Sequence, residues 1–278
     1  MKFTKRLVVG LVSTGIIATL FTGCTNKDVT PVRAESAEEA INLFNEYNKS
    51  NDIENMVSLY SKVYLDSVGY SSGTVVKMLE ANRKNAEITK SETESIEVID
   101  ENIEKAVVNM AIMEDGKEVP YTYNYAMVKE DDGWAVSPDG VIECTNVEAP
   151  EIVSGKLNIY LSKMIKLVDG YILRADISNN SSKAYSFGKE GNLCKVVVET
   201  TEGEYSTSML EEVKLDKKVK TYFMARFDEL AGEVKKVTVT NVYDIEDDAD
   251  SNCMYTTLEN KIIPTYYNKD SSGISEKW

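Results

Sequence analysis

The segment Tyr121-Thr-Tyr-Asn-Tyr-Ala-Met-Val128 decides the fold of the first half of the chain. Its residues alternate between two faces, and this period of two predicts a β-strand. The dipeptides Asp115-Gly116 and Asp132-Gly133 flank this segment. They predict turns, because glycine adopts positive φ without steric cost. The segment and its neighbours therefore predict an antiparallel meander, whose other strands lie in residues 94–100, 105–113 and 133–136.

Upstream of the meander the apolar residues recur at helical spacing. Ser36-Ala-Glu-Glu39 has the pattern of a capping box, in which the serine hydroxyl and the glutamate satisfy each other's backbone amides. Three helices are expected, beginning near Ser36, Asp52 and Thr74. Helices followed by a meander predict an α+β domain, with N-terminal helices packed on a curved antiparallel sheet as a cone-like roll. The apolar stripes of the helices are Ala37, Ala40, Ile41 and Phe44; Ile53, Met56, Val57 and Tyr60; and Val75, Met78, Leu79 and Ala86.

Residues 156–247 have only strand-like patterns, separated by turn-rich segments. In the segment GYILRADIS, residues 170–178, Tyr171, Leu173 and Ala175 alternate with Ile172, Arg174 and Asp176, as in a half-buried strand. Six or so short strands at this spacing predict an all-β sandwich. Residues 147–155, with Pro150, are expected to form a linker, and residues 248–278 an acidic turn and C-terminal tail.

Two segments add a resemblance to known families. The order of the elements and the closing KEDDGWAVSPDG, residues 129–140, resemble the nuclear-transport-factor-2-like cone, a cystatin-like fold, over residues 36–146. YILRADISNNSSKAYSFG, residues 171–188, resembles the Ig-like modules of Gram-positive lipoproteins. The resemblance implies a cone-like domain followed by an Ig-like sandwich.

The N-terminus has the pattern of an export signal. Lys2, Lys5 and Arg6 precede an apolar run of 14 residues, Leu7 to Leu20, which is shorter than the roughly 20 residues that cross a bilayer as a helix. Phe21-Thr-Gly-Cys24 then resembles a bacterial lipobox, with phenylalanine where leucine is usual. An ordinary secretory signal or an uncleaved anchor is the alternative.

The lipobox resemblance implies an address for the chain. Residues 1–23 would be the cleaved lipoprotein signal peptide, and Cys24 would carry diacylglycerol and palmitate. Residues 24–35 would form the lipidated tether, and the protein would be exported and anchored by lipid to the outer face of the cytoplasmic membrane. The few arginines among the basic residues, and the abundant Asn, Ile and Tyr, indicate an AT-rich genome and hence a Gram-positive bacterium.

The charge balance limits the partners. The net charge is −15, and removing Lys2, Lys5 and Arg6 leaves 28 basic against 46 acidic side chains, a balance of −18. Such a surface repels nucleic acid and anionic lipid. The membrane is therefore expected to hold the protein through the lipid anchor, and the partner to be an envelope protein or a small ligand.

The cysteines of the chain form no metal-binding pattern. Cys144, Cys194 and Cys253 remain after Cys24, and their spacing and the absence of histidine match no zinc site. One disulfide with a free thiol is open, and buried apolar thiols are favoured.

The acidic segment that begins at Asp248 aligns with a twelve-residue calcium loop. Cys253, however, stands where that loop needs glycine, and the flanks read as strand and coil, so a solvated acidic turn is favoured over calcium; no other cofactor is expected. The four positions that match are Asp248, Asp250, Asn252 and Glu259.

Tyr121, Tyr123 and Tyr125 are the candidate ligand-binding residues, because they share a strand face with Met127. In cone folds this face can hold a small apolar ligand, and tyrosine supplies a ring and a hydroxyl. The alternative interpretation is packing alone. Relatives of the ketosteroid-isomerase type use a tyrosine donor with a carboxylate base there, but the sequence places no carboxylate opposite these tyrosines.

The absence of histidine and of phosphate-binding motifs excludes most enzyme classes, so no catalytic residue is predicted. The sequence favours a non-enzymatic binding or interaction module at the membrane surface. The alternatives are a small-molecule pocket enzyme of the isomerase or dehydratase type in the cone, and a structural envelope spacer.

Overall fold

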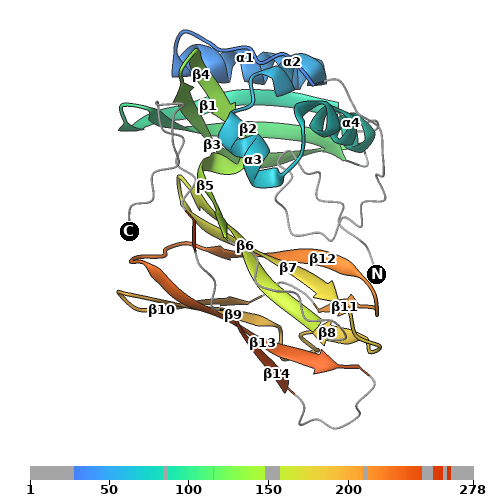
Figure 1. Ribbon diagram of the computed structural model, residues 1–278. Helices are drawn as coiled ribbons and strands as arrows, with labels where there is room; N and C mark the ends of the chain where they lie inside the picture. The colour runs from blue at the N-terminus through green and yellow to red at the C-terminus, as the bar shows by residue number, and fades with distance from the viewer. Residues whose placement is uncertain are drawn as a thin grey trace. The chain divides into compact units, whose positions relative to one another are not determined.

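Figure 1 shows a computed structural model of the chain. It describes residues 28–83, 87–114, 116–147, 157–208 and 212–245, and the backbone of the strand segments 253–258 and 262–263. The expected signal peptide, the lipidation site Cys24 and all four residues of the calcium motif lie outside the described residues. Contacts divide the chain into two compact units, with the division between Cys144 and Thr145.

Four helices open the first unit, and the meander follows them. Helices α1 and α2 cover one face of a four-stranded antiparallel sheet (Figure 1), and α1 contacts β1, β3 and β4. The sheet order is β1-β2-β3-β4. The helices are α1 Ala37–Ser50, α2 Ile53–Ser58, α3 Lys62–Val68 and α4 Ser72–Arg83, and the strands are β1 Glu87–Asp100, β2 Ile103–Glu114, β3 Lys117–Glu130 and β4 Gly133–Ser137, followed by the short 3-10 turn η1 Pro138–Gly140.

The cap of α1 differs from the expected capping box in one bond. The Glu39 amide donates to the Ser36 hydroxyl at 3.1 Å, as expected of an N-cap. The Glu39 carboxylate, however, accepts from the amide of Glu35 at 2.8 Å rather than from that of Ser36. The sequence also missed α3, whose seven residues are too few to show a helical period.

The edge of the sheet at β4 is closed by two segments from outside the meander. Ala34 bridges to Trp134, and Tyr60 bridges to Val136 in parallel. Gly133 begins the strand with φ +131°, and a Cβ at this position would lie 2.6 Å from the carbonyl oxygen of Ala34. This close approach requires glycine. Among the described residues β1, at the opposite edge, pairs only with β2.

The second unit contains two antiparallel sheets. One has the order β10-β9-β13-β8-β11, with β14 paired to β13, and the other has the order β12-β7-β6-β5-β15. A single core is formed by residues of both sheets, among them Leu161, Phe187, Val198 and Phe223. Strand β5 Val141–Val147 crosses the division between the two units. The other strands are β6 Leu157–Leu167, β7 Gly170–Asn179, β8 Tyr185–Phe187, β9 Lys195–Thr200, β10 Glu204–Ser208, β11 Val213–Leu215, β12 Lys220–Phe227, β13 Val234–Asp244, β14 Cys253–Leu258 and β15 Ile262–Ile263.

The predicted α+β class is confirmed at this level: four N-terminal helices are followed by three antiparallel sheets. The sequence missed β8 and β11, because three-residue strands are too short to show alternation. It also missed β5, which lies where the first predicted domain was expected to pass into the linker. Cys144 and Cys194 are buried in the thiol form, as the sequence favoured. No helix in the described part of the chain is long and apolar enough to cross a membrane.

Candidate functional site

The three candidate tyrosines lie on β3, on one face as predicted, but at different depths. Tyr125 is buried, whereas Tyr121 and Tyr123 are half-buried. The rings of Tyr121 and Tyr123 stack with centroids 6.1 Å apart, and those of Tyr123 and Tyr125 are 6.3 Å apart. The three rings therefore form a row that runs from a partly exposed position into the core.

Residues of the helices continue this aromatic row. The ring of Phe44 on α1 lies 5.0 Å from that of Tyr125 and 6.2 Å from that of Tyr60, and Tyr60 meets Tyr64 edge to face at 5.2 Å. Tilted and edge-to-face pairs are the geometries that aromatic quadrupoles favour. Tyr125 is therefore first a core residue, and its hydroxyl donates to the sulfur of Met110 at 3.6 Å.

A buried cation lies beside this aromatic core. Arg83, the last residue of α4, is 2% exposed. Its Nη1 donates to Asn48 Oδ1 at 2.7 Å and lies 3.7 Å from the sulfur of Met56. Among the described residues, its Nε and Nη2 have no hydrogen-bond partner. Burying an arginine whose guanidinium is only partly hydrogen-bonded costs several kcal/mol, roughly, so this side chain is an unusual polar group in the core of the unit.

Asn48 connects Arg83 to a chain of buried hydrogen bonds between α1 and β1. Asn48 Nδ2 donates to the Ser91 hydroxyl at 3.2 Å. Ser91 in turn donates to Asn45 Oδ1 at 2.8 Å, and Asn45 Nδ2 donates to Thr93 at 2.9 Å. Because each buried polar group costs free energy unless it is bonded, this chain fixes the register of α1 on β1.

Two charges act on the buried tyrosine hydroxyls. Burial raises the pKa of Tyr60 well above its usual value; the Arg83 guanidinium opposes that rise and the Asp139 carboxylate adds to it. Burial also raises the pKa of Tyr125, with smaller increases from Tyr60 and Asp139. Asp139 has φ +58°, a left-handed conformation that is uncommon for a residue other than glycine. Arg83, Asp139 and the two hydroxyls thus share one electrostatic environment, in which both tyrosines stay neutral.

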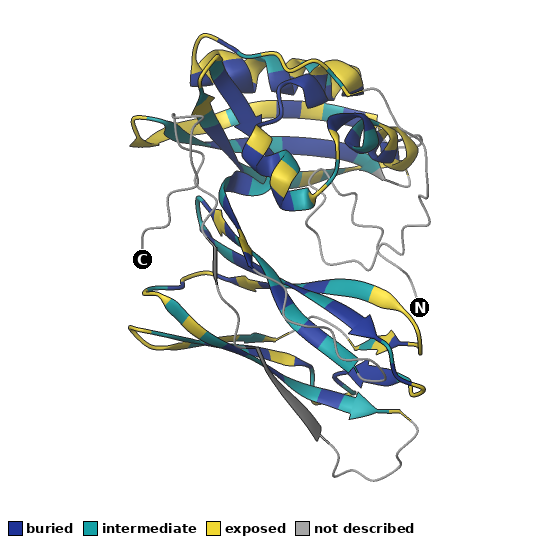
Figure 2. Cartoon of the chain, in the orientation of Figure 1, coloured by how far each residue is buried: buried dark blue, intermediate teal, exposed yellow. Residues whose placement is uncertain are grey.

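A second feature of the first unit is the far end of the hairpin formed by β1 and β2. Residues 94–100 of β1 are exposed on both faces of the strand, and Figure 2 shows this stretch at one end of the sheet. Three apolar side chains stand in it: Ile96 is 37% exposed, Val98 70% and Ile99 45%. The acidic residues around them are Glu94, Glu97, Asp100 and Glu101.

The edge of β1 also carries features that oppose self-pairing. Its ladder with β2 is irregular at three places, between Ile88 and Lys90, between Thr93 and Ser95, and between Val98 and Asp100. Bulges and charges are devices by which natural edge strands avoid pairing with one another. The irregular ladder and the charges therefore oppose pairing of this edge with a strand of another molecule.

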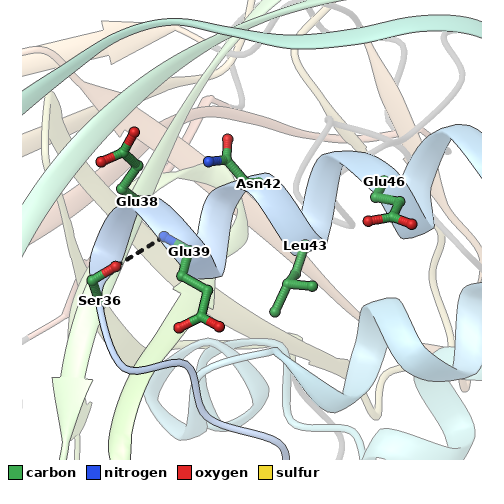
Figure 3. A pocket seen from close by; sticks show the side chains of 6 residues that line it. All are labelled: Ser36, Glu38, Glu39, Asn42, Leu43 and Glu46. Atoms are coloured by element: carbon green, nitrogen blue, oxygen red, sulfur yellow. Dashed lines mark hydrogen bonds between the residues drawn. The ribbon is translucent and has the colours of Figure 1, made fainter.

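Acidic side chains line a hollow in the first unit. A hollow along α1 is lined by Ser36, Glu38, Glu39, Asn42, Leu43 and Glu46, and Figure 3 shows Glu39 and Leu43 on the same side of the helix. No group of three or more Cys, Asp or Glu residues within the described ranges is placed to hold a metal ion. The calcium motif Asp248, Asp250, Asn252 and Glu259 lies outside those ranges and stays a prediction.

Comparisons with known proteins add no family. No protein-family model matches the chain. A search of curated proteins finds no significant match either.

The sequence reasoning missed Arg83, although a signal was present. Val75, Leu79 and Arg83 are four residues apart, so Arg83 continues the buried stripe of α4. On α1, Asn48 follows Phe44 at the same spacing. A polar residue on an apolar stripe marks a buried hydrogen-bond network, whereas a lone arginine at a helix end is usually taken as a solvated cap.

The raised tyrosine pKa values predict how stability depends on pH. Because both folded pKa values exceed the unfolded value of about 10, the neutral tyrosines contribute their full stability below pH 10 and lose it as the pH rises further, by about 1.4 kcal/mol per pH unit for each. The free energy of unfolding, measured with urea between pH 9 and pH 11, should therefore fall less steeply with pH in Tyr60→Phe than in the wild type. It should fall least steeply in the double variant Tyr60→Phe/Tyr125→Phe. Ile112→Val, at a buried residue of β2 that pairs with Val119, serves as the control: it lowers stability without changing the slope. Parallel curves for all four proteins would contradict the assignment.

Proposed function

We propose that the chain is an exported, lipid-anchored, non-enzymatic binding module of the bacterial cell envelope. In this proposal Cys24 carries the lipid, the first unit is a nuclear-transport-factor-2-like cone, and the second is an Ig-like sandwich. Support comes from the lipobox-like FTGC and from the order of four helices before an antiparallel sheet. For the sandwich, it comes from two sheets that contribute to one core.

The observation that carries the binding role is the apolar group Ile96, Val98 and Ile99 at the end of β1. Of the six large apolar side chains that are exposed among the described residues, these three lie within four positions of one strand. The other three, Val32, Val219 and Ile245, are scattered singly. Single exposed apolar residues are normal, whereas a cluster at an end of a sheet is typical of an interaction surface.

The charges around this surface favour one kind of partner. Glu94, Glu97, Asp100 and Glu101 flank the apolar residues along the chain, and Lys105 stands opposite Glu97 on β2. Acidic side chains outnumber basic ones here, so a second copy of the chain would bring mostly carboxylates against carboxylates. A protein that presents apolar side chains flanked by lysine or arginine would complement both the apolar centre and the acidic rim. We propose such a cationic envelope protein as the partner.

The enzyme alternative has less support. Catalysis with a tyrosine donor needs a carboxylate within hydrogen-bond reach of the tyrosine. The Tyr125 hydroxyl instead donates to the thioether of Met110, and its burial keeps it protonated. The spacer alternative gives no reason for Ile96, Val98 and Ile99 to be exposed together.

The lipid anchor is tested by cell fractionation. In Cys24→Ala the acyl chains have no attachment point, so the protein should leave the membrane fraction or retain an uncleaved signal peptide, and labelled palmitate should not be incorporated. Thr25→Ala, one residue further along, should behave as the wild type. Palmitate incorporation by Cys24→Ala would overturn the lipidation proposal.

The binding surface is tested by site-specific photocrosslinking of the full chain in intact cells of its own host. A photoreactive residue in place of Val98 should give a discrete adduct with one protein. The same residue in place of Val32, 46% exposed in the same unit, or of Val219, 39% exposed in the second unit, should not. Glu94→Lys/Glu97→Lys should abolish the adduct, because it reverses the charge of the rim.

The identity of the adduct separates the outcomes. A basic protein supports the proposal, and a second copy of the chain would replace it with self-association. Equal labelling from positions 32, 98 and 219 would overturn the claim that the end of β1 is a binding surface.

A further inference from the structure

The buried guanidinium of Arg83 is half satisfied in a specific way. Its Nη1 is bonded to Asn48, whereas Nε and Nη2 have no partner in the part of the chain that the structure describes. The N–H bonds of Nε and Nη2 lie side by side and point in the same direction, as one edge of the planar fork. This edge matches the two oxygens of a carboxylate, and such paired bonds are among the strongest that arginine makes.

The other described arginines use the same nitrogens for carboxylates. Arg33 donates from both Nε and Nη2 to Glu130, at 2.8 and 2.6 Å. Arg174 donates from Nε to Asp176 at 2.9 Å, and Arg226 donates from Nη2 to Asp169 at 2.8 Å. Arg83 is the exception within the described ranges, although it is the arginine whose charge is most deeply buried.

We infer that the open edge of Arg83 is the binding site for the carboxylate group of a small ligand inside the first unit. The site consists of the guanidinium, with Asn48 holding it in place. The hydroxyls of Tyr60 and Tyr125 and the Asp139 carboxylate share its electrostatic environment. A carboxylate there completes the hydrogen bonds of Nε and Nη2, which Asp139 leaves open. The site is separate from the exposed end of β1, so it stands or falls independently of the proposed partner.

The surrounding side chains set the class of ligand. Asn48, Met56 and Tyr60 are each at most 2% exposed, so a ligand bound to the guanidinium among them must be small, with few atoms beyond the carboxylate. The aromatic and thioether side chains around it favour an apolar remainder over a second charge. Small monocarboxylates such as formate, acetate and propionate fit this description, whereas a dicarboxylate would bring an uncompensated second charge into the core.

The test uses the five arginines of the chain as reporters. The full-length protein in mild detergent is labelled with ¹⁵N-arginine, and the Nε–H signals are followed by NMR during titration with formate, acetate and propionate. Sodium chloride at equal ionic strength is the control. The Arg83 signal should shift saturably with carboxylate and not with chloride, while the signal of Arg33, whose Nε and Nη2 are both already bonded to Glu130, should stay in place.

Arg83→Lys identifies the signal, because it keeps the charge but loses the fork. If that variant does not fold, the NMR signal of Arg83 is identified in a second way. The substitutions Arg33→Lys, Arg174→Lys and Arg226→Lys are combined with removal of residues 1–23, so that Arg83 is the one arginine left in the protein. If the site is already filled by a carboxylic acid from the host, added carboxylate moves no signal. Mass spectrometry of the denatured protein would then detect the released acid, and this result also supports the inference. The inference is overturned if no such acid is released and the Arg83 signal is unmoved, or moves equally with chloride.

Discussion

The hydrogen bond from Arg83 to Asn48 is the interaction on which the arrangement of the first unit depends. It joins the end of α4 to the last turn of α1, and Asn48 passes the constraint to Ser91 on β1. Each group in this chain is buried, so any shift of α1 along β1 would leave a donor or acceptor without a partner and cost about 1–3 kcal/mol. Hydrophobic packing holds the layers together, but it is not directional; these bonds select one register.

The same unit thus contains two places where binding is expected, and they differ in kind. The core around Arg83 is buried and aromatic, and two nitrogens of the guanidinium have no hydrogen-bond partner among the described residues. The end of β1 is exposed, and its apolar residues alternate with acidic ones along the chain. One suits a small acid and the other a basic protein surface. The helices cover the sheet above the buried part of β1, where Ile88 and Ser91 lie, and the strand continues beyond them into solvent.

The predictability of the fold varied with the length of each pattern. The stripe Ala37, Ala40, Ile41 and Phe44 predicted α1 because four apolar residues at helical spacing are hard to produce by chance, and all four are buried. The alternation around Tyr123 predicted β3 for the same reason. Helix α3 and strands β8 and β11 were missed, because they are shorter than the window in which a period can be seen.

The candidate site was only partly predictable. The sequence indicated that Tyr121, Tyr123 and Tyr125 share a face, but not that only Tyr125 would be buried, because depth depends on where the helices end. Asp139 was invisible as a neighbour of the tyrosines: it lies in a turn after β4, and only the folded sheet brings its charge to Tyr60 and Tyr125. Ile96, Val98 and Ile99 read as ordinary strand residues, since no local pattern tells how far the layer above a strand extends.

The most direct test of this account is a double-mutant cycle on the buried bond, with Arg83→Met, Asn48→Leu and the double variant compared by urea unfolding. If the Arg83–Asn48 bond fixes the helices on the sheet, the two substitutions should be coupled by about 1.5–3 kcal/mol, the range for a hydrogen bond to a charged group. Effects that add within about 0.5 kcal/mol would contradict the central role of this bond and leave the register of α1 to apolar packing.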